Sequence, residues 1–308
     1  MDYKNLRIVF LGTPEFAKGI LQKLHESGCN IVGVITAPDK PAGRGMKLQQ
    51  SAVKQYAMEQ GLHILQPEKL KNTVFLDSLK SLNADIQIVV AFRMLPEVVW
   101  NMPPMGTINL HASLLPQYRG AAPINWAIIN GETKTGLTTF KLQHEIDTGN
   151  ILLQKEMEID PDENAGQLHD EMKELGADLM LETIIGIANG TLHEIPQNIL
   201  DQEQIKHAPK IFTETCRIEW NKSVKEIYNL IRGLSPFPTA FTLIQEKNFK
   251  IFSATYMECD THVDPGTLKI EKNQLSISCK NGFIYPIVVQ AEGKKKMNID
   301  EYLRGARL

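Results

Sequence analysis

The chain has 308 residues, of which 43% are hydrophobic and 22% are charged, and its formal net charge is −3. These values are those of an ordinary soluble globular protein that is long enough for two domains. No apolar run approaches the length of a membrane span, and the N-terminus lacks the basic and apolar regions of a signal peptide. The four cysteines are scattered without a C-x-x-C pair, so neither a zinc site nor a disulfide framework is indicated. We therefore expect a cytoplasmic protein without a membrane partner and without a metal.

Short apolar segments alternate with helical segments over the first part of the chain. Strands are expected at 6–11, 31–35, 86–91, 107–113, 136–142 and 151–159, and helices at 13–27, 50–60, 72–82, 95–101, 124–130 and 164–188. The near-continuous apolar run at 86–91 is typical of a parallel strand that is buried on both faces. This β-α-β order predicts a Rossmann-like domain, but Gly12 is not followed by the glycines of a nicotinamide dinucleotide site.

The segment 36–48 interrupts this alternation and reads T-A-P-D-K-P-A-G-R-G-M-K-L. Its two prolines, two glycines and three cations predict a long loop without regular structure. Such a loop is either simply solvated or a basic arm, in which Lys40, Arg44 and Lys47 contact the phosphates of a nucleic acid.

The last part of the chain differs in pattern and in charge. Residues 191–209 are polar and are interpreted as a linker, and a helix is expected at 221–233. Short strands are then expected at 239–244, 249–254, 266–270, 275–279 and 284–290, which suits a small OB-like β-barrel. Residues 1–209 hold 18 Lys/Arg against 25 Asp/Glu, whereas the remaining residues hold 15 against 11. A basic C-terminal part would suit a polyanionic partner.

Two polar motifs stand out from this background. The first, at 107–123, reads T-I-N-L-H-A-S-L-L-P-Q-Y-R-G-A-A-P and opens as a strand on which Asn109 and His111 point to the same face. An amide and an imidazole at the C-terminal end of a strand match the usual location of active sites in open α/β sheets. The second motif, H-E-I-D-T-G-N at 144–150, follows the next apolar strand. Aspartic proteases also carry D-T-G, but they are all-β and need paired aspartates, which nothing here supplies.

Together, N-x-H-x-S-L-L-P-x-Y-R-G-x-x-P and D-T-G-N resemble the folate-dependent formyltransferases, most closely those that act on methionyl-tRNA. The resemblance covers nearly the whole chain, including the turn at Pro236, Phe237 and Pro238. It implies an α/β fold class with a Rossmann-like formyltransferase domain at 1–190, a linker at 191–209 and a smaller OB-like tRNA-binding domain at 210–308.

The resemblance also implies an activity and a set of site residues. The implied reaction moves the formyl group of 10-formyltetrahydrofolate to the α-amino group of initiator methionyl-tRNA for translation initiation and leaves tetrahydrofolate; we expect a monomer to carry it out. The assigned residues are the catalytic trio Asn109, His111 and Asp147, the folate-binding segment Ser113, Leu114, Leu115 and Pro116, and the tRNA contacts Lys40, Arg44 and Lys47.

The chemistry of these side chains fits acyl transfer to an amine. An amine is already nucleophilic, so the reaction requires a donor for the developing oxyanion and a group that moves a proton. The Asn109 amide is a suitable donor, and the His111 ring can accept or release a proton. Asp147 would orient the ring and stabilise its charged form. Whether His111 removes the proton or stabilises the oxyanion is left open by the sequence.

Four residues depart from the family pattern, and several functions stay possible. Arg93 stands near a family glycine, His144 and Glu145 stand where the family often has Glu-Gly, and Asn150 stands where aspartate is common. Arg119 either contacts substrate or only holds its turn. The alternatives within the same chemistry are a sugar-nucleotide formyltransferase and a 10-formyltetrahydrofolate hydrolase. Those outside it are a non-catalytic tRNA-binding protein and a dinucleotide-binding regulator. The basic segment at 36–48 and the lysines at 294–296 favour tRNA.

Overall fold

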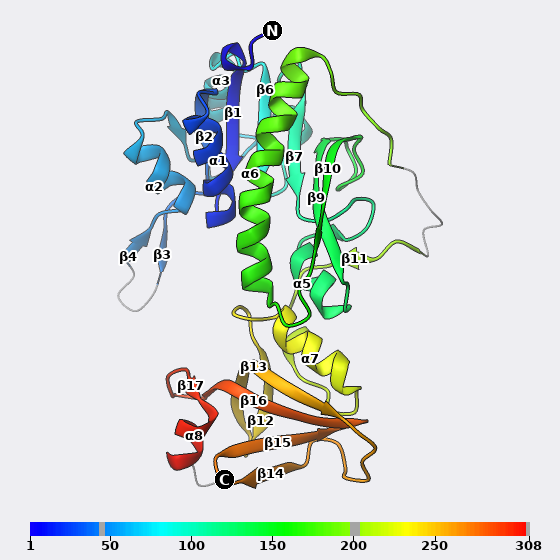
Figure 1. Ribbon diagram of the computed structural model, residues 1–308. Coiled ribbons are helices and arrows are strands. Elements are labelled where there is room, and N and C mark those ends of the chain that lie inside the picture. The colour runs from blue at the N-terminus through cyan, green and yellow to red at the C-terminus, as the bar shows by residue number, and fades with distance from the viewer. Residues whose placement is uncertain (43–46, 198–203, 306–308) are drawn as a thin grey trace. The chain divides into compact units, whose positions relative to one another are not determined.

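The computed structural model describes residues 1–42, 47–197 and 204–305, and its chain forms two compact units (Figure 1). The first unit comprises residues 1–119, 136–156 and 169–206. The second comprises residues 120–135, 157–168 and 207–308. No helix in the described part of the chain is both long enough and apolar enough to cross a membrane.

The first unit is built on a seven-stranded sheet in the order β10-β9-β7-β6-β1-β2-β5. Its strands are β1 (Arg7–Gly12), β2 (Asn30–Ile35), β5 (Ile64–Leu65), β6 (Ile86–Val90), β7 (Thr107–His111), β9 (Lys134–Lys141) and β10 (Ile151–Glu158). The pairs from β5 to β7 are parallel, and β9 runs antiparallel to β7. In chain order, β2 and β5 are added to the sheet on one side of β1, and β6 and β7 are then added on its other side. In sheets of this kind, ligands bind beyond the carboxyl ends of the strands near the reversal.

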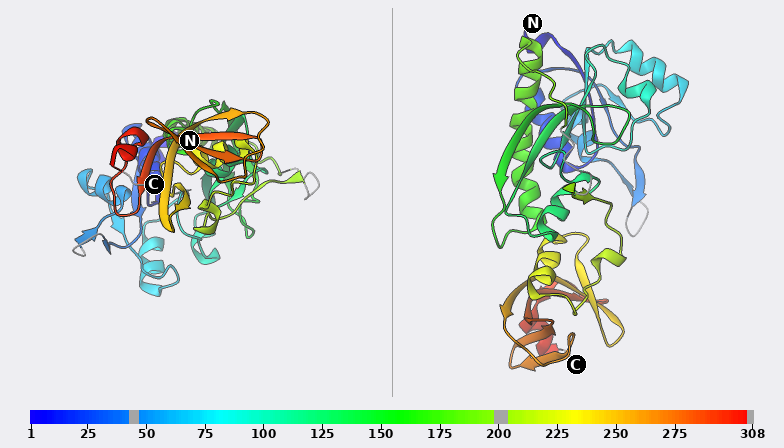
Figure 2. Two further views of the ribbon diagram at one scale, coloured as in Figure 1. Left: turned by 90° about the horizontal axis from the view of Figure 1, so that it is seen from below. Right: turned by 90° about the vertical axis from the view of Figure 1, so that its right-hand side faces the viewer.

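Helices cover both faces of this sheet. They are α1 (Glu15–Glu26), α2 (Ala52–Glu59), α3 (Thr73–Ser81), α4 (Glu97–Trp100) and α6 (Ala165–Asn189). Phe75 and Leu79 of α3 pack with Val9 and Leu11 of β1 on one face. The opposite face is covered by α6, which runs along the strands in Figure 1 and in the right-hand view of Figure 2. The sheet is therefore buried on both sides, as its apolar strands require.

The segment 36–48 contains a β-hairpin, so the prediction of a loop without regular structure is wrong. Strands β3 (Lys40–Ala42) and β4 (Lys47–Gln49) pair antiparallel, with Pro41 opposite Leu48. A two-stranded hairpin tolerates proline because an edge strand does not need every N–H for pairing. At its base, Asp39 accepts hydrogen bonds from Lys54 Nζ at 2.6 Å and Gln66 Nε2 at 2.8 Å. Lys40 is exposed, and Arg44 lies outside the described residues.

The second unit consists of helices packed with an antiparallel sheet in the order β12-β13-β16-β15-β14. Its elements are α5 (Pro123–Ile129), α7 (Val224–Gly233), β12 (Ala240–Ile244), β13 (Lys247–Glu258), β14 (Leu268–Glu271), β15 (Gln274–Cys279), β16 (Gly282–Ala291), β17 (Met297–Asn298) and α8 (Ile299–Gly305). Further short strands are β8 (Arg119–Gly120) and β11 (His207–Ala208). The first turn of α7 has a capping box between Ser223 and Glu226, and its apolar face packs with Phe249 and Ile284.

The predicted fold class is confirmed: an α/β domain with a largely parallel sheet precedes a smaller antiparallel β domain. The five strands expected in the C-terminal part correspond to β12 to β16, each within a few residues of its expected bounds. The predicted domain limits at 190 and 210 stay a prediction.

Candidate active site

Strand β7 carries the first polar pair of the site. Asn109 pairs with Val89, and Val89 belongs to the cluster of buried residues on the face covered by α3. His111 lies two residues further along the same strand and is 6% exposed, whereas Asn109 is half-buried. Among the described residues, no group is hydrogen-bonded to the Asn109 side-chain amide. Its donors are therefore available to a bound molecule.

The His111 ring is held by a backbone carbonyl. Its Nε2 lies 2.9 Å from the carbonyl oxygen of Tyr118. Because a carbonyl oxygen only accepts, Nε2 carries the proton, and in the neutral ring Nδ1 presents its lone pair. Nδ1 lies 3.9 Å from Asp147 Oδ2, which is ion-pair distance but longer than a hydrogen bond. The Tyr118 carbonyl thus orients the ring, and Asp147 is placed to stabilise its charged form.

Each residue of the D-T-G motif has its own part in the loop between β9 and β10. Asp147 has a φ of 54°, a left-handed conformation that aspartate adopts more readily than most residues. Thr148 closes the turn by donating from Oγ1 to the Glu145 carbonyl at 3.0 Å. Gly149 lies against β9, where an added Cβ would be 1.7 Å from the Lys141 carbonyl oxygen. The position of the Asp147 carboxylate therefore depends on a close contact between the loop and β9, which only glycine permits at position 149.

The segment from Ser113 to Pro116 is held by a bond within its own turn and by a bond to β9. Ser113 donates from Oγ to the Gln117 carbonyl at 2.6 Å, and the Leu115 N–H donates to Thr138 Oγ1 at 3.1 Å. Leu115 is buried in a small cluster of apolar side chains. Of the four residues predicted to bind folate, only Leu114 and Pro116 are half-buried and keep accessible surface.

The packing of Leu115 leads to a prediction about stability. Leu115→Asp is expected to unfold the first unit, because it places an unpaired charge against Phe140 and Ile151. The loss in the free energy of unfolding should exceed about 3 kcal/mol in urea titrations. Leu115→Met, which conserves volume, should cost less than about 1.5 kcal/mol. A folded Leu115→Asp protein of near-normal stability would contradict this placement.

Two of the residues that depart from the family pattern hold loops in place. Arg93 follows β6 and donates from Nη1 to the Glu68 carbonyl at 2.8 Å and from Nη2 to that of Pro67. It therefore ties the segment after β6 to the chain before α3. Asn150 donates to Glu194 Oε2 at 2.9 Å, and this bond, with a further one from Lys141, lowers the pKa of Glu194.

Gln197 is a site residue that the sequence reasoning missed. It is 9% exposed, and its Nε2 donates to the carbonyl oxygens of Asp147 at 2.9 Å and Gly149 at 2.8 Å. Its Oε1 accepts from Arg119 Nε at 3.2 Å and Nη2 at 2.5 Å. Arg119 therefore helps to hold the site together. No pattern in the sequence points to Gln197, because bonds to backbone carbonyls leave no signature in the residues that supply them.

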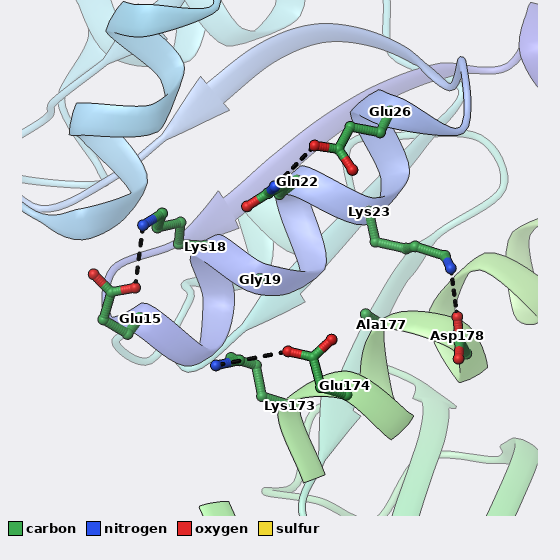
Figure 3. Close-up of a pocket in the computed structure, with 10 residues that line it drawn as sticks. All are labelled: Glu15, Lys18, Gly19, Gln22, Lys23, Glu26, Lys173, Glu174, Ala177 and Asp178. Carbon is green, nitrogen blue, oxygen red and sulfur yellow. Dashed lines mark hydrogen bonds and ion pairs between the residues drawn. The ribbon is translucent and has the colours of Figure 1, made fainter. Parts of the chain in front are cut away.

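A charged groove elsewhere in the first unit is separate from this site. It has a volume of about 310 Å³ and lies between α1 and α6 (Figure 3). Its side chains pair with one another, as in the 2.6 Å contact between Lys23 Nζ and Asp178 Oδ1. None of the predicted site residues lines it, so we do not place the chemistry there. In the described part of the chain, no three His, Cys, Asp or Glu side chains gather as a metal site would require.

Comparison with known families gives two matches that together span most of the chain. The formyl transferase model matches residues 6–184, and the model of the formyl transferase C-terminal domain matches residues 210–307. The methionyl-tRNA formyltransferase of Bacteroides thetaiotaomicron is 52% identical over 315 residues, covering 100% of this chain and 98% of its own length. That of Flavobacterium johnsoniae is 53% identical over 306 residues, covering 98% of this chain and 96% of its own.

Solved structures share the fold at much lower sequence identity. An N-formyltransferase from Helicobacter canadensis, in complex with folinic acid and dTDP-3-aminofucose, has a TM-score of 0.69 and 21% identity over 93% of this chain and 99% of its own. HypX from Aquifex aeolicus in complex with tetrahydrofolic acid has a TM-score of 0.64 and 18% identity over 97% of this chain. This chain corresponds to 47% of that HypX chain.

Proposed function

The chain belongs to the methionyl-tRNA formyltransferase family, and from this premise we propose that Asn109, His111 and Asp147 catalyse its formyl transfer. The reaction moves a formyl group from 10-formyltetrahydrofolate to the α-amino group of methionyl-tRNA. The resemblance to folate-dependent formyltransferases is thereby confirmed. The observation that carries the proposed roles is the 3.9 Å approach of His111 Nδ1 to Asp147 Oδ2, beside the available amide of Asn109.

The proton chemistry follows from the orientation of the imidazole. Because Nε2 is bonded to the Tyr118 carbonyl, Nδ1 is the nitrogen that takes the proton from the attacking amine. The resulting imidazolium lies at ion-pair distance from the Asp147 carboxylate, which stabilises it until the proton passes to N10 of the departing tetrahydrofolate. The Asn109 amide donates to the oxygen on which negative charge develops. The structure therefore favours His111 as the base and Asn109 as the oxyanion donor.

The residues around the trio fit a folate. When bound, 10-formyltetrahydrofolate supplies the formyl carbonyl that the amine attacks. A pterin requires apolar walls with a few placed polar groups. Leu114 and Pro116 offer half-buried apolar surface, and Met94 and Ile146 are 74% and 61% exposed on the loops after β6 and β9. We propose that Leu114 and Pro116 contact the pterin directly, whereas Ser113 and Leu115 shape the turn.

One assay tests the function as a whole. The enzyme is incubated with 10-formyltetrahydrofolate and, in separate reactions, methionyl-tRNA, a 4-amino sugar nucleotide or water alone. Formylmethionyl-tRNA is the expected product, with initiator tRNA used faster than elongator tRNA. Formylated sugar or free formate as the main product would instead identify a sugar-nucleotide formyltransferase or a hydrolase. Size-exclusion chromatography with light scattering tests the proposed monomer, and cell fractionation tests the proposed cytoplasmic location.

The hairpin of β3 and β4 is proposed to contact the tRNA. Arg44 has glycines on both sides, which permit close approach of its backbone, and a guanidinium pairs with two phosphate oxygens. Arg44→Ala should lower kcat/KM for methionyl-tRNA and reduce the slope of its salt dependence by up to ~1. Arg44→Lys should restore part of the loss, and folate affinity should not change.

A matched control for this prediction is Lys71→Ala, which removes one exposed positive charge outside the hairpin. It should leave the salt dependence close to that of the wild type. If kcat/KM depended on salt with equal slopes for Arg44→Ala and the wild type, the proposed contact between the hairpin and the tRNA would be contradicted.

A further inference from the structure

The segment after α6 contacts the D-T-G loop and the first residue of β10. Ile195 exchanges two backbone hydrogen bonds of 2.8 Å with Ile151. Glu194 accepts from Asn150 and from Lys141, as described above. Gln197 then makes the contact nearest the chemistry, because it bonds to the backbone of Asp147 itself. Part of what the sequence predicts as a linker therefore pairs with the start of β10, and within it Gln197 is the residue that bonds to the backbone of Asp147.

Gln197 also reaches the other side of the site. Its Oε1 accepts from the guanidinium of Arg119, which directly follows Tyr118 in the chain. The Tyr118 carbonyl holds His111 Nε2, and the Asp147 carboxylate faces His111 Nδ1. One buried side chain thus joins the two backbone segments that act on the two nitrogens of the imidazole.

The chemistry of these contacts requires a glutamine. A side-chain amide donates from its nitrogen to two carbonyls and accepts at its oxygen from a guanidinium. A glutamate would still accept from Arg119, but it would turn a carboxylate oxygen toward the carbonyls of Asp147 and Gly149. A methionine would fill similar space without making any of these bonds.

We propose that Gln197 is a positioning residue for formyl transfer. It fixes the position of the Asp147 loop relative to the Tyr118–Arg119 turn, so that both keep their contacts with His111. This inference rests on the roles proposed above for His111 and Asp147. The left-handed φ of 54° at Asp147 gives the reason that such support is needed. A residue in that conformation returns to extended or helical geometry unless its neighbours hold it.

The main test is a double-mutant cycle on kcat. Gln197→Ala should lower kcat by about 10- to 100-fold, since a misplacement near 1 Å costs that much, while KM for both substrates changes little. In an Asp147→Asn background, the same substitution should lower kcat by a clearly smaller factor, because only its hold on the Tyr118–Arg119 turn is then left to lose. Equal factors in both backgrounds would overturn the proposal. If Asp147→Asn alone had no effect, the proposed function of the trio would fail instead.

Further variants separate positioning from packing. Gln197→Glu should lose activity as Gln197→Ala does, although it keeps the acceptor for Arg119, and Gln197→Met should lose it although the volume is kept. Glu194→Ala is the matched control, because it removes contacts of the same segment that do not involve Asp147. Its kcat should stay within about threefold of the wild type at a similar melting temperature. Full activity of Gln197→Met would show that Gln197 acts only by filling space. A loss in Glu194→Ala equal to that in Gln197→Ala would show that the whole segment acts only through stability.

Discussion

Replacing His111 by alanine is expected to lower kcat for formyl transfer by about 10²- to 10⁴-fold while the protein stays folded. The ring is the only group in the proposed trio placed to take the proton, and its loss leaves the Asp147 carboxylate without an imidazolium to stabilise. Asp147→Asn should cost about 10²-fold or more, because the amide is neutral and cannot stabilise the imidazolium. Single-turnover formylation with saturating substrates measures both effects.

The two residues share one task, so the double variant should be little slower than the slower single variant. His63→Ala, which removes an exposed histidine elsewhere in the first unit, is the control and should retain full activity. Fully multiplicative losses would show that His111 and Asp147 act independently. Circular dichroism and thermal melting should place all variants in the folded state at the assay temperature.

Gly149→Ala is expected to have the second largest effect on activity, because the added Cβ would clash with β9. It would lie 1.7 Å from the Lys141 carbonyl oxygen and 3.1 Å from the Phe140 ring. The loop must therefore move away from β9 and take Asp147 with it. We expect kcat to fall by about 10²-fold and the free energy of unfolding to fall by about 1–3 kcal/mol.

Gly305→Ala is the matched control for this substitution, because no atom of the described residues lies within 4 Å of the Cβ added there. It should change neither activity nor stability by a measurable amount. If Gly149→Ala retained full activity, the D-T-G loop could not depend on its contact with β9, and Asp147 would have to be held in another way.

The sequence predicts those parts of the fold that are encoded locally. The apolar run at 86–91 becomes the central parallel strand β6, and the helical spacing at 164–188 becomes α6 within one residue at each end. The hairpin of β3 and β4 is not predicted, because proline and glycine within a charged segment carry the same signals as an irregular loop. The two-residue strand β5 and the last helix α8 are also missed, since each is short and depends on tertiary contacts.

In the candidate site too, the parts encoded in a local motif are predicted and the parts that depend on tertiary contacts are not. Asn109, His111 and Asp147 could be proposed from the sequence because their side chains form a motif. The groups that hold them could not, because the carbonyl of Tyr118 is a backbone atom and Gln197 lies 50 residues from Asp147 and 78 from Arg119. The packing of Leu115 against Phe140 and Ile151 could not be predicted from its motif either, and its predicted contact with folate stays a prediction.

The outermost strand of the seven-stranded sheet has a consequence for self-association. An open edge offers unpaired backbone groups with which a second copy of the sheet could pair. Along β10, the beginning of that edge is occupied by Ile195, and Lys155 and Glu156 place exposed charges further along. We therefore expect the segment around Ile195 also to hinder separate molecules from pairing edge to edge. Weakening it should appear as turbidity in concentrated samples as well as in slower turnover.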